Sequence, residues 1–226
     1  MLVVEFIGCP GVGKSSVFNP VMDSVRSKGF SVENIHRSEM RVNKFYRKWI
    51  TFESQISSKN SGLKSAISSF TECVDDPKSL VWTKDLLNAS FKLNSGKINK
   101  LDYAFFEEGP TQYISSIAHQ KNIKDMNAKL LIDAVNESIY SHDTIAFYVE
   151  ADLEDIVSRL VKRGKTNDRY ILNDADAMME QLVVKKDNIE YLIERLNYKA
   201  IHRIKNDDLD QAINKAKSIM DGYTEV

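Results

Sequence analysis

The sequence is poor in the features that mark several classes of protein. Only two of its 226 residues are cysteine, which is too few for a disulfide framework. No apolar run approaches the roughly 18 residues that cross a membrane, and no basic segment precedes the short apolar stretch at the N-terminus, as a signal peptide would require. The net charge of −1 lacks the positive excess of nucleic-acid-binding proteins. These absences predict a cytoplasmic protein with no membrane span and no nucleic-acid partner.

Glycine and proline are also scarce, with 9 and 4 copies, yet the stretch "GCPGVGKSS" holds three of the glycines and one proline. It fits the pattern G-x-x-x-x-G-K-[ST], whose fixed positions are Gly8, Gly13, Lys14 and Ser15. The short apolar segment 2–7 before it predicts a buried strand, and apolar residues at helical spacing after it predict a helix. A strand, a glycine-rich loop and a helix in this order are typical of a phosphate-binding loop.

The residue types of this loop suit the phosphates of ATP. Glycines let backbone N–H groups approach the phosphates closely, and the helix N-terminus adds further unpaired N–H groups. Lys14 supplies a cation for the β- and γ-phosphates, and Ser15 supplies a hydroxyl for Mg²⁺. The residues expected to contact the nucleotide here are Gly8, Gly11, Val12, Gly13, Lys14, Ser15 and Ser16.

Strand and helix patterns alternate along the rest of the chain. Such alternation is typical of an α/β fold with a parallel sheet flanked by helices, and we expect one domain over 1–226. Residues 38–100 show helical patterns and no strand, which predicts a helical insert. The predicted strands include 2–7, 30–36 and the stretches "LDYAFFEEG", "DTIAFYVEAD" and "KAIHRIKNDD"; the predicted helices span about 110–121, 124–141, 153–161, 174–197 and 208–221.

Two adjacent carboxylates, Glu107 and Glu108, end the third predicted strand in "YAFFEEG". A phosphate loop needs an acid that organises the metal, and a second carboxylate could polarise the attacking nucleophile. We expect Glu107 to act as metal acid or base and Glu108 as its partner, although the sequence leaves the division of roles open. An ordinary solvated turn is the alternative.

A basic cluster, "RLVKRGKTNDR", contains Arg159, Arg163 and Arg169. One interpretation is a lid over 162–172 whose arginines Arg163 and Arg169 neutralise the transferring phosphoryl group, with Arg159 near the nucleotide. The other is a solvated helix end, where cations are favoured.

The insert begins with basic and aromatic residues interleaved in "MRVNKFYRKW". If the insert forms the acceptor pocket, Arg37, Arg41 and Arg47 are candidate contacts to an anionic group. A packed aromatic face with solvated cations around it explains the same pattern.

Together these motifs resemble the P-loop kinases of nucleosides and nucleotides, and most of all thymidylate kinases. The resemblance rests on "GCPGVGKS", "FFEEG" and "RGKTNDR" in that order. It implies a five-stranded parallel sheet with strand order 2-3-1-4-5, an Asn206 that approaches the adenine, and a homodimer through 110–141. Glu108 stands where these kinases have an arginine that touches the acceptor.

The resemblance implies an ATP- and Mg²⁺-dependent phosphotransferase that moves the γ-phosphate to a hydroxyl or phosphate group of a small acceptor. The arginine replaced by Glu108 leaves the acceptor open, because a second carboxylate would repel a 5′-phosphate. A kinase of a sugar or glycan terminus is therefore an alternative. A regulatory NTPase that hydrolyses ATP or GTP is an alternative of another class.

Overall fold

The computed structural model describes residues 1–35, 61–72, 74, 76, 79–95, 98–118, 121–163 and 174–225. Its centre is a five-stranded sheet in the order β2-β3-β1-β4-β5, in which every neighbouring pair is parallel. The fold class and the strand order predicted above are therefore confirmed. The strands are β1 (Leu2–Ile7), β2 (Val32–Asn34), β3 (Tyr103–Phe106), β4 (Thr144–Glu150) and β5 (Ala200–Lys205).

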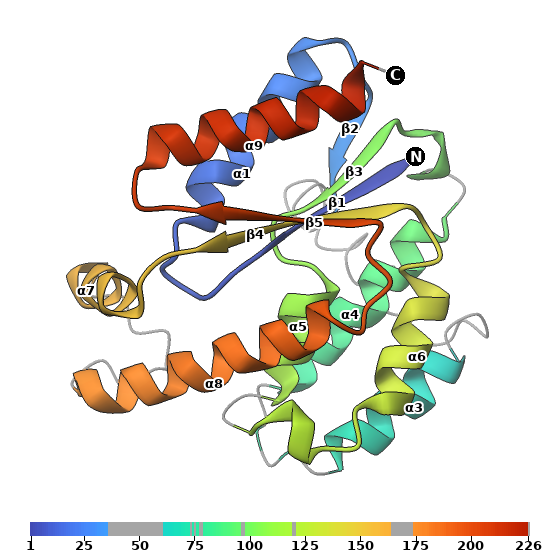
Figure 1. Cartoon of the computed structure of the whole chain (residues 1–226). Helices are drawn as coiled ribbons and strands as arrows, with labels where there is room; N and C mark the ends of the chain where they lie inside the picture. Colours follow the sequence, from blue (N-terminus) through green and yellow to red (C-terminus); the bar gives the residue numbers. More distant parts are fainter. Residues whose placement is uncertain are drawn as a thin grey trace.

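Helices cover both faces of this sheet (Figure 1). One face carries α1 (Lys14–Ser27) and α9 (Leu209–Thr224). The opposite face carries α3 (Ser61–Thr71), α4 (Ser79–Leu93), α5 (Pro110–Ala118), α6 (Lys129–Ser138) and α8 (Ala175–Ile193). The short helix α7 (Leu153–Arg163) lies beyond the arrowheads of β4 and β5 and contacts α8. Of the helices in the described ranges, none has the length and apolarity to cross a bilayer.

The central strands are mostly apolar because both of their faces are covered, and Glu5 of β1 is a buried exception. The side chains of Phe6 in β1 and Phe147 in β4 stack with ring centroids 5.0 Å apart, and Phe18 of α1 meets Phe6 edge-on at 5.2 Å. This cluster fills the layer between the sheet and α1. A second apolar cluster joins the other face of β1 and β3 to α3, α4, α5 and α6.

The predicted elements are present with shifted ends. Strand β2 begins at Val32 rather than near residue 30, and residue 36 lies outside the described part of the chain. Helix α6 begins at Lys129 rather than near residue 124, because Ile123–Asp125 forms a separate 3₁₀ turn. The Asn122 side chain caps this turn by accepting a hydrogen bond from the Lys124 N–H. Within 38–100 the described residues form α3, α4 and the 3₁₀ turn Ile98–Lys100. Residues 38–60 lie outside the described part of the chain, so the helical insert as a whole stays a prediction.

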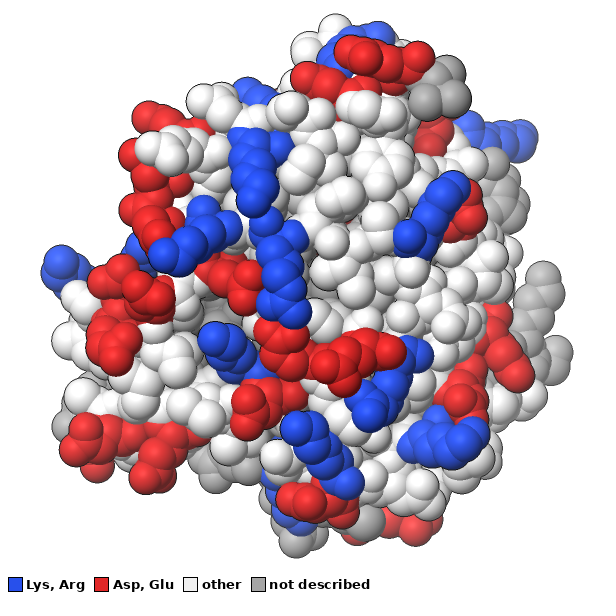
Figure 2. All heavy atoms as spheres, viewed as in Figure 1, with Lys and Arg blue, Asp and Glu red and all other residues white. Residues whose placement is uncertain are grey.

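Charges of both signs lie side by side on the face formed by β5, α8 and α9 (Figure 2). Arg203 of β5 donates to Glu150 over 3.0 Å and to Glu190 of α8 over 2.6 Å. The described residues of this face form no continuous basic band of the kind that tracks a nucleic-acid backbone.

Candidate functional site

The glycine-rich loop joins β1 to α1, as the motif predicts. Gly13 takes φ +89° at the start of α1, in the left-handed region that favours glycine. A Cβ atom at Gly13 would also collide with the Asn206 amide nitrogen, so glycine is required for two reasons. No side chain of the described residues caps the first turn of α1. The N–H of Ser16 donates to the Gly13 carbonyl oxygen over 3.0 Å. The remaining N–H groups at the start of the helix can receive an anion such as a phosphate.

Two side chains from distant elements brace this loop. The carbonyl oxygen of Val12 accepts hydrogen bonds from Asn206 Nδ2 over 2.6 Å and from Arg159 Nη1 over 3.4 Å. Arg159 Nη2 also donates to the carbonyl oxygen of Asn206 over 3.2 Å. The resemblance assigns Asn206 an approach to the adenine, and the structure adds that its amide holds the loop. Contact of Asn206 or Arg159 with a nucleotide stays a prediction.

A cleft of about 400 Å³ opens beside the loop. It lies between the start of α1, the end of α7 and the connection from β5 to α9, where three cationic side chains gather. Cations gathered in a cleft favour an anionic ligand such as a polyphosphate. Arg163 lines the cleft, whereas Arg169 and the rest of the predicted lid from residue 164 to 172 lie outside the described residues. The lining residues are Gly11, Gly13, Ser16, Arg159, Lys162, Arg163, Asn206, Asp207 and Leu209.

The sheet brings the acid pair to the loop, because β3 is the parallel neighbour of β1. Glu107 is buried and Glu108 is half-buried at the carboxyl end of β3. Burial lowers the pKa of Lys14, while the nearby carboxylates of Glu108 and then Glu107 oppose that shift. The ammonium group and the two carboxylates therefore share one site at the carboxyl edge of the sheet.

The residues at this edge also fit Mg²⁺. Ser15 is exposed at the start of α1 and offers a hydroxyl, and Glu107 offers a carboxylate; both are the hard oxygen ligands that Mg²⁺ prefers. The described residues contain no group of three or more His, Cys, Asp or Glu side chains that would form a closed metal site. A nucleotide-bound Mg²⁺ needs only one or two protein ligands, because phosphates and water complete its shell.

The three arginines proposed for the acceptor, Arg37, Arg41 and Arg47, lie outside the described residues. The described end of the insert does reach the site. Helix α4 packs on α5, the helix that follows the acid pair, and the rings of Trp82 and Tyr113 lie 6.0 Å apart at this contact.

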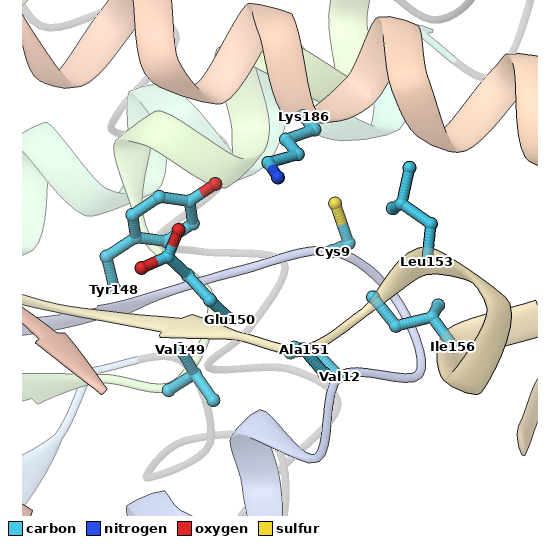
Figure 3. A pocket seen from close by; sticks show the side chains of 9 residues that line it. All are labelled: Cys9, Val12, Tyr148, Val149, Glu150, Ala151, Leu153, Ile156 and Lys186. Carbon is cyan, nitrogen blue, oxygen red and sulfur yellow. The ribbon is translucent and has the colours of Figure 1, made fainter. Parts of the chain in front are cut away.

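A small pocket lies behind the loop on the side of α8 (Figure 3). Its volume of about 10 Å³ has room for one water molecule. The Cys9 thiol and the Lys186 ammonium point toward one another there, beside Tyr148 and Glu150 of β4 (Figure 3). Burial raises the pKa of the Cys9 thiol to about 11, although the Lys185 charge opposes the shift. The thiol is therefore protonated at neutral pH.

We expect Cys9 to resist alkylation in the folded protein. At pH 8 a pKa of about 11 leaves about one thiol in a thousand ionised, and the thiolate is the reactive form. Iodoacetamide followed by peptide mass spectrometry measures the modification of Cys9 separately from that of Cys73. Rapid labelling of Cys9 in native buffer would contradict the expectation, and urea-unfolded protein provides the positive control.

The fold has known counterparts among solved structures. The deoxyadenosine kinase from M. mycoides with products dCMP and a flexible dCDP bound matches with a TM-score of 0.53 and 11% identity, over 99% of this chain and 100% of that chain. The structure of deoxyadenosine kinase from M. mycoides with bound dATP gives a TM-score of 0.53 and 12% identity, over 98% and 100%. This chain shares its fold with these deoxyadenosine kinases. At such low identity the likeness establishes the fold alone, so the narrower resemblance to thymidylate kinases stays a prediction. No protein-family model matches the sequence, and no curated protein matches it either.

Two buried ionisable residues near the glycine-rich loop were missed by the sequence analysis. Glu5 lies within the otherwise apolar strand β1 and is 1% exposed. Lys185 of α8 is 5% exposed and donates to the Ser116 hydroxyl over 2.8 Å. A charged residue inside an apolar strand is unusual, so Glu5 could have been noticed in the sequence. Lys185 could not, because one lysine of a neighbouring pair on a long helix gives no sign of its burial.

Proposed function

We propose that this chain is an ATP- and Mg²⁺-dependent kinase that phosphorylates a hydroxyl group of a nucleoside. The observation that supports it is the meeting of a phosphate-binding loop, Lys14 and a carboxylate pair at the ends of neighbouring strands. A loop alone would support nucleotide binding. The adjacent carboxylates add the groups that transfer to a hydroxyl requires.

In this proposal each part of the site has one task. The loop and the start of α1 hold the phosphates of ATP, and Lys14 neutralises charge on the transferring group. A carboxylate of the pair accepts the proton of the acceptor hydroxyl as its oxygen bonds to the γ-phosphorus. The bond from that phosphorus to the bridging oxygen breaks, and ADP leaves. Bound at Ser15 and Glu107, Mg²⁺ would supply charge neutralisation between the β- and γ-phosphates.

Two considerations favour an uncharged acceptor such as a nucleoside. Glu108 stands where the resembled kinases place an arginine, and two carboxylates disfavour an acceptor that already carries a phosphate. The similar solved structures are described as deoxyadenosine kinases. A nucleoside agrees with both considerations. A nucleoside monophosphate carries the charge that the first consideration disfavours.

The proposal is tested by transfer from γ-labelled ATP with Mg²⁺ to a panel of nucleosides, deoxynucleosides, their monophosphates and simple sugars. We expect label in a nucleoside monophosphate, and no such label with a Lys14→Met variant. Transfer only to monophosphates or sugars would overturn the acceptor assignment and keep the kinase. Release of inorganic phosphate alone, whatever is added, would favour a hydrolytic NTPase.

A further inference from the structure

Glu5 is the centre of a buried hydrogen-bond network that ties four parts of the chain together. Its Oε2 atom accepts from the hydroxyls of Tyr140 and Tyr198, each over 2.6 Å. Its Oε1 atom accepts from the Thr111 N–H over 3.0 Å. Tyr140 follows α6 and Tyr198 precedes β5, so the network joins β1 to α5 and to two connections on the same side of the sheet. Burial raises the pKa of Glu5, and the tyrosine hydroxyls oppose the shift.

The network reaches the site through the start of α5. Pro110 is the first residue of this helix and has no N–H, so the bond from Thr111 satisfies one of the helix's first free donors. Gly109 lies directly against the Glu5 side chain, since a Cβ atom there would come within 2.6 Å of the carboxyl carbon. Glu5 thus occupies the space that a side chain at Gly109 would fill and caps α5 from the neighbouring strand. A carboxyl group at this position also complements the positive end of the helix dipole.

We infer that Glu5 is a positioning residue for the carboxylate pair Glu107 and Glu108. The pair immediately precedes Gly109, so fixing Gly109 and Thr111 fixes the direction in which the turn presents its carboxylates. Strand β1 also leads directly into the phosphate-binding loop. Glu5 therefore joins the two halves of the site from a buried position that does not line the cleft beside the loop. This inference rests on the function proposed above and extends it beyond the groups that contact ATP.

Hydrogen counting identifies the substitution that should preserve this role. The hydroxyls of Thr111, Tyr140 and Tyr198 contact one another as well as Glu5. The hydroxyls make three contacts with one another and two with Glu5 Oε2, but they supply only three hydrogens. A group at the Glu5 position that donates hydrogens can therefore be accommodated. Glutamine offers such a donor at Nε2 and keeps an oxygen for the Thr111 N–H. Methionine has a similar length and can make neither bond.

The test compares Glu5→Met with Glu5→Gln in two measurements. Kinetics use ATP and the acceptor found in the panel, and we expect Glu5→Met to lower kcat about 10- to 100-fold, because an error of about 1 Å in a positioned group costs up to about 10²-fold. The KM for ATP should change less than about twofold, since the phosphate-binding loop is intact. Glu5→Gln should stay within about threefold of the wild-type kcat. Amide hydrogen exchange should be faster in the peptide that contains 107–112 of Glu5→Met, with exchange in α1 unchanged.

Tyr140→Phe is the matched control for a purely structural role. It removes one hydroxyl from the network and leaves the bond between Thr111 and Glu5 in place. We expect a lower Tm with kcat within about threefold of wild type. The inference is overturned if Glu5→Met keeps the wild-type kcat, if Tyr140→Phe loses as much kcat as Glu5→Met, or if exchange at 107–112 is unaltered. If the wild-type protein transfers phosphate to no acceptor, the proposed function fails, and the exchange measurement alone decides whether Glu5 holds the turn.

Discussion

Replacing Lys14 by methionine is expected to lower kcat for phosphoryl transfer about 10³-fold, the scale on which removal of a single positioned donor or cation acts. The Lys14 ammonium is the one charge that the loop motif places at the β- and γ-phosphates. Methionine keeps the length of the side chain without its charge. Burial lowers the pKa of Lys14 while the carboxylates of Glu108 and Glu107 oppose the shift, so a thermal melt is needed to show that Lys14→Met remains folded. Steady-state transfer and a thermal melt provide the two measurements.

Lys28→Met is a suitable control for this substitution. Lys28 lies just after the C-terminus of α1, at the end opposite to Lys14, and pairs with Asp221 over 2.7 Å at the surface. Exposed pairs of this kind contribute about 0.2–1 kcal/mol, so kcat should remain within about twofold of wild type. If Lys14→Met retained more than about a tenth of the wild-type kcat, Lys14 would not be the cation that serves the transferring group.

The strand, loop and helix that carry this site could be predicted because the residues that indicate them are adjacent in the chain. Loop, strand and helix are adjacent in the chain from residue 2 to residue 27, and the acids follow an apolar strand directly. The strand order then brought the two together, as the resemblance implied. The apolar stripe of α8 was also predictable, since Met178, Leu182 and Ile189 recur at helical spacing and are fully buried.

What the sequence did not predict depends on contacts between distant residues. Glu5 meets Tyr140 and Tyr198 across 135 and 193 positions, and no periodicity links them. Asn206 was expected at the adenine from family resemblance, but its bond to the Val12 carbonyl depends on how the β5–α9 connection folds onto the loop. The start of α6 shifted for a similar reason, because Asn188 of α8 accepts from the Ile123 N–H over 2.8 Å and stabilises the preceding 3₁₀ turn.

Replacing Glu107 by glutamine should change the Mg²⁺ dependence of the rate, whereas replacing Glu108 by glutamine should change kcat itself. Glu107 is only 4% exposed at the carboxyl end of β3, and it is the carboxylate that we place beside Mg²⁺. We therefore expect Glu107→Gln to raise the Mg²⁺ concentration for half-maximal rate about tenfold or more, with kcat partly restored at high Mg²⁺. Glu108 is half-buried, so part of its side chain is accessible to solvent. Glu108→Gln should lower kcat about 10²- to 10⁴-fold at any Mg²⁺ concentration, as loss of a general base does.

A Mg²⁺ titration of each variant at saturating ATP and acceptor distinguishes these roles. If Glu108 is the base, Glu108→Gln should stay slow at every Mg²⁺ concentration, whereas Glu107→Gln should recover as Mg²⁺ rises. If instead Glu108→Gln is rescued by Mg²⁺ and Glu107→Gln is not, the two roles are exchanged. If neither variant loses more than about threefold, the carboxylate pair has no part in the transfer. The proposal of a kinase would then lose the feature that distinguishes this site from one that only binds a nucleotide.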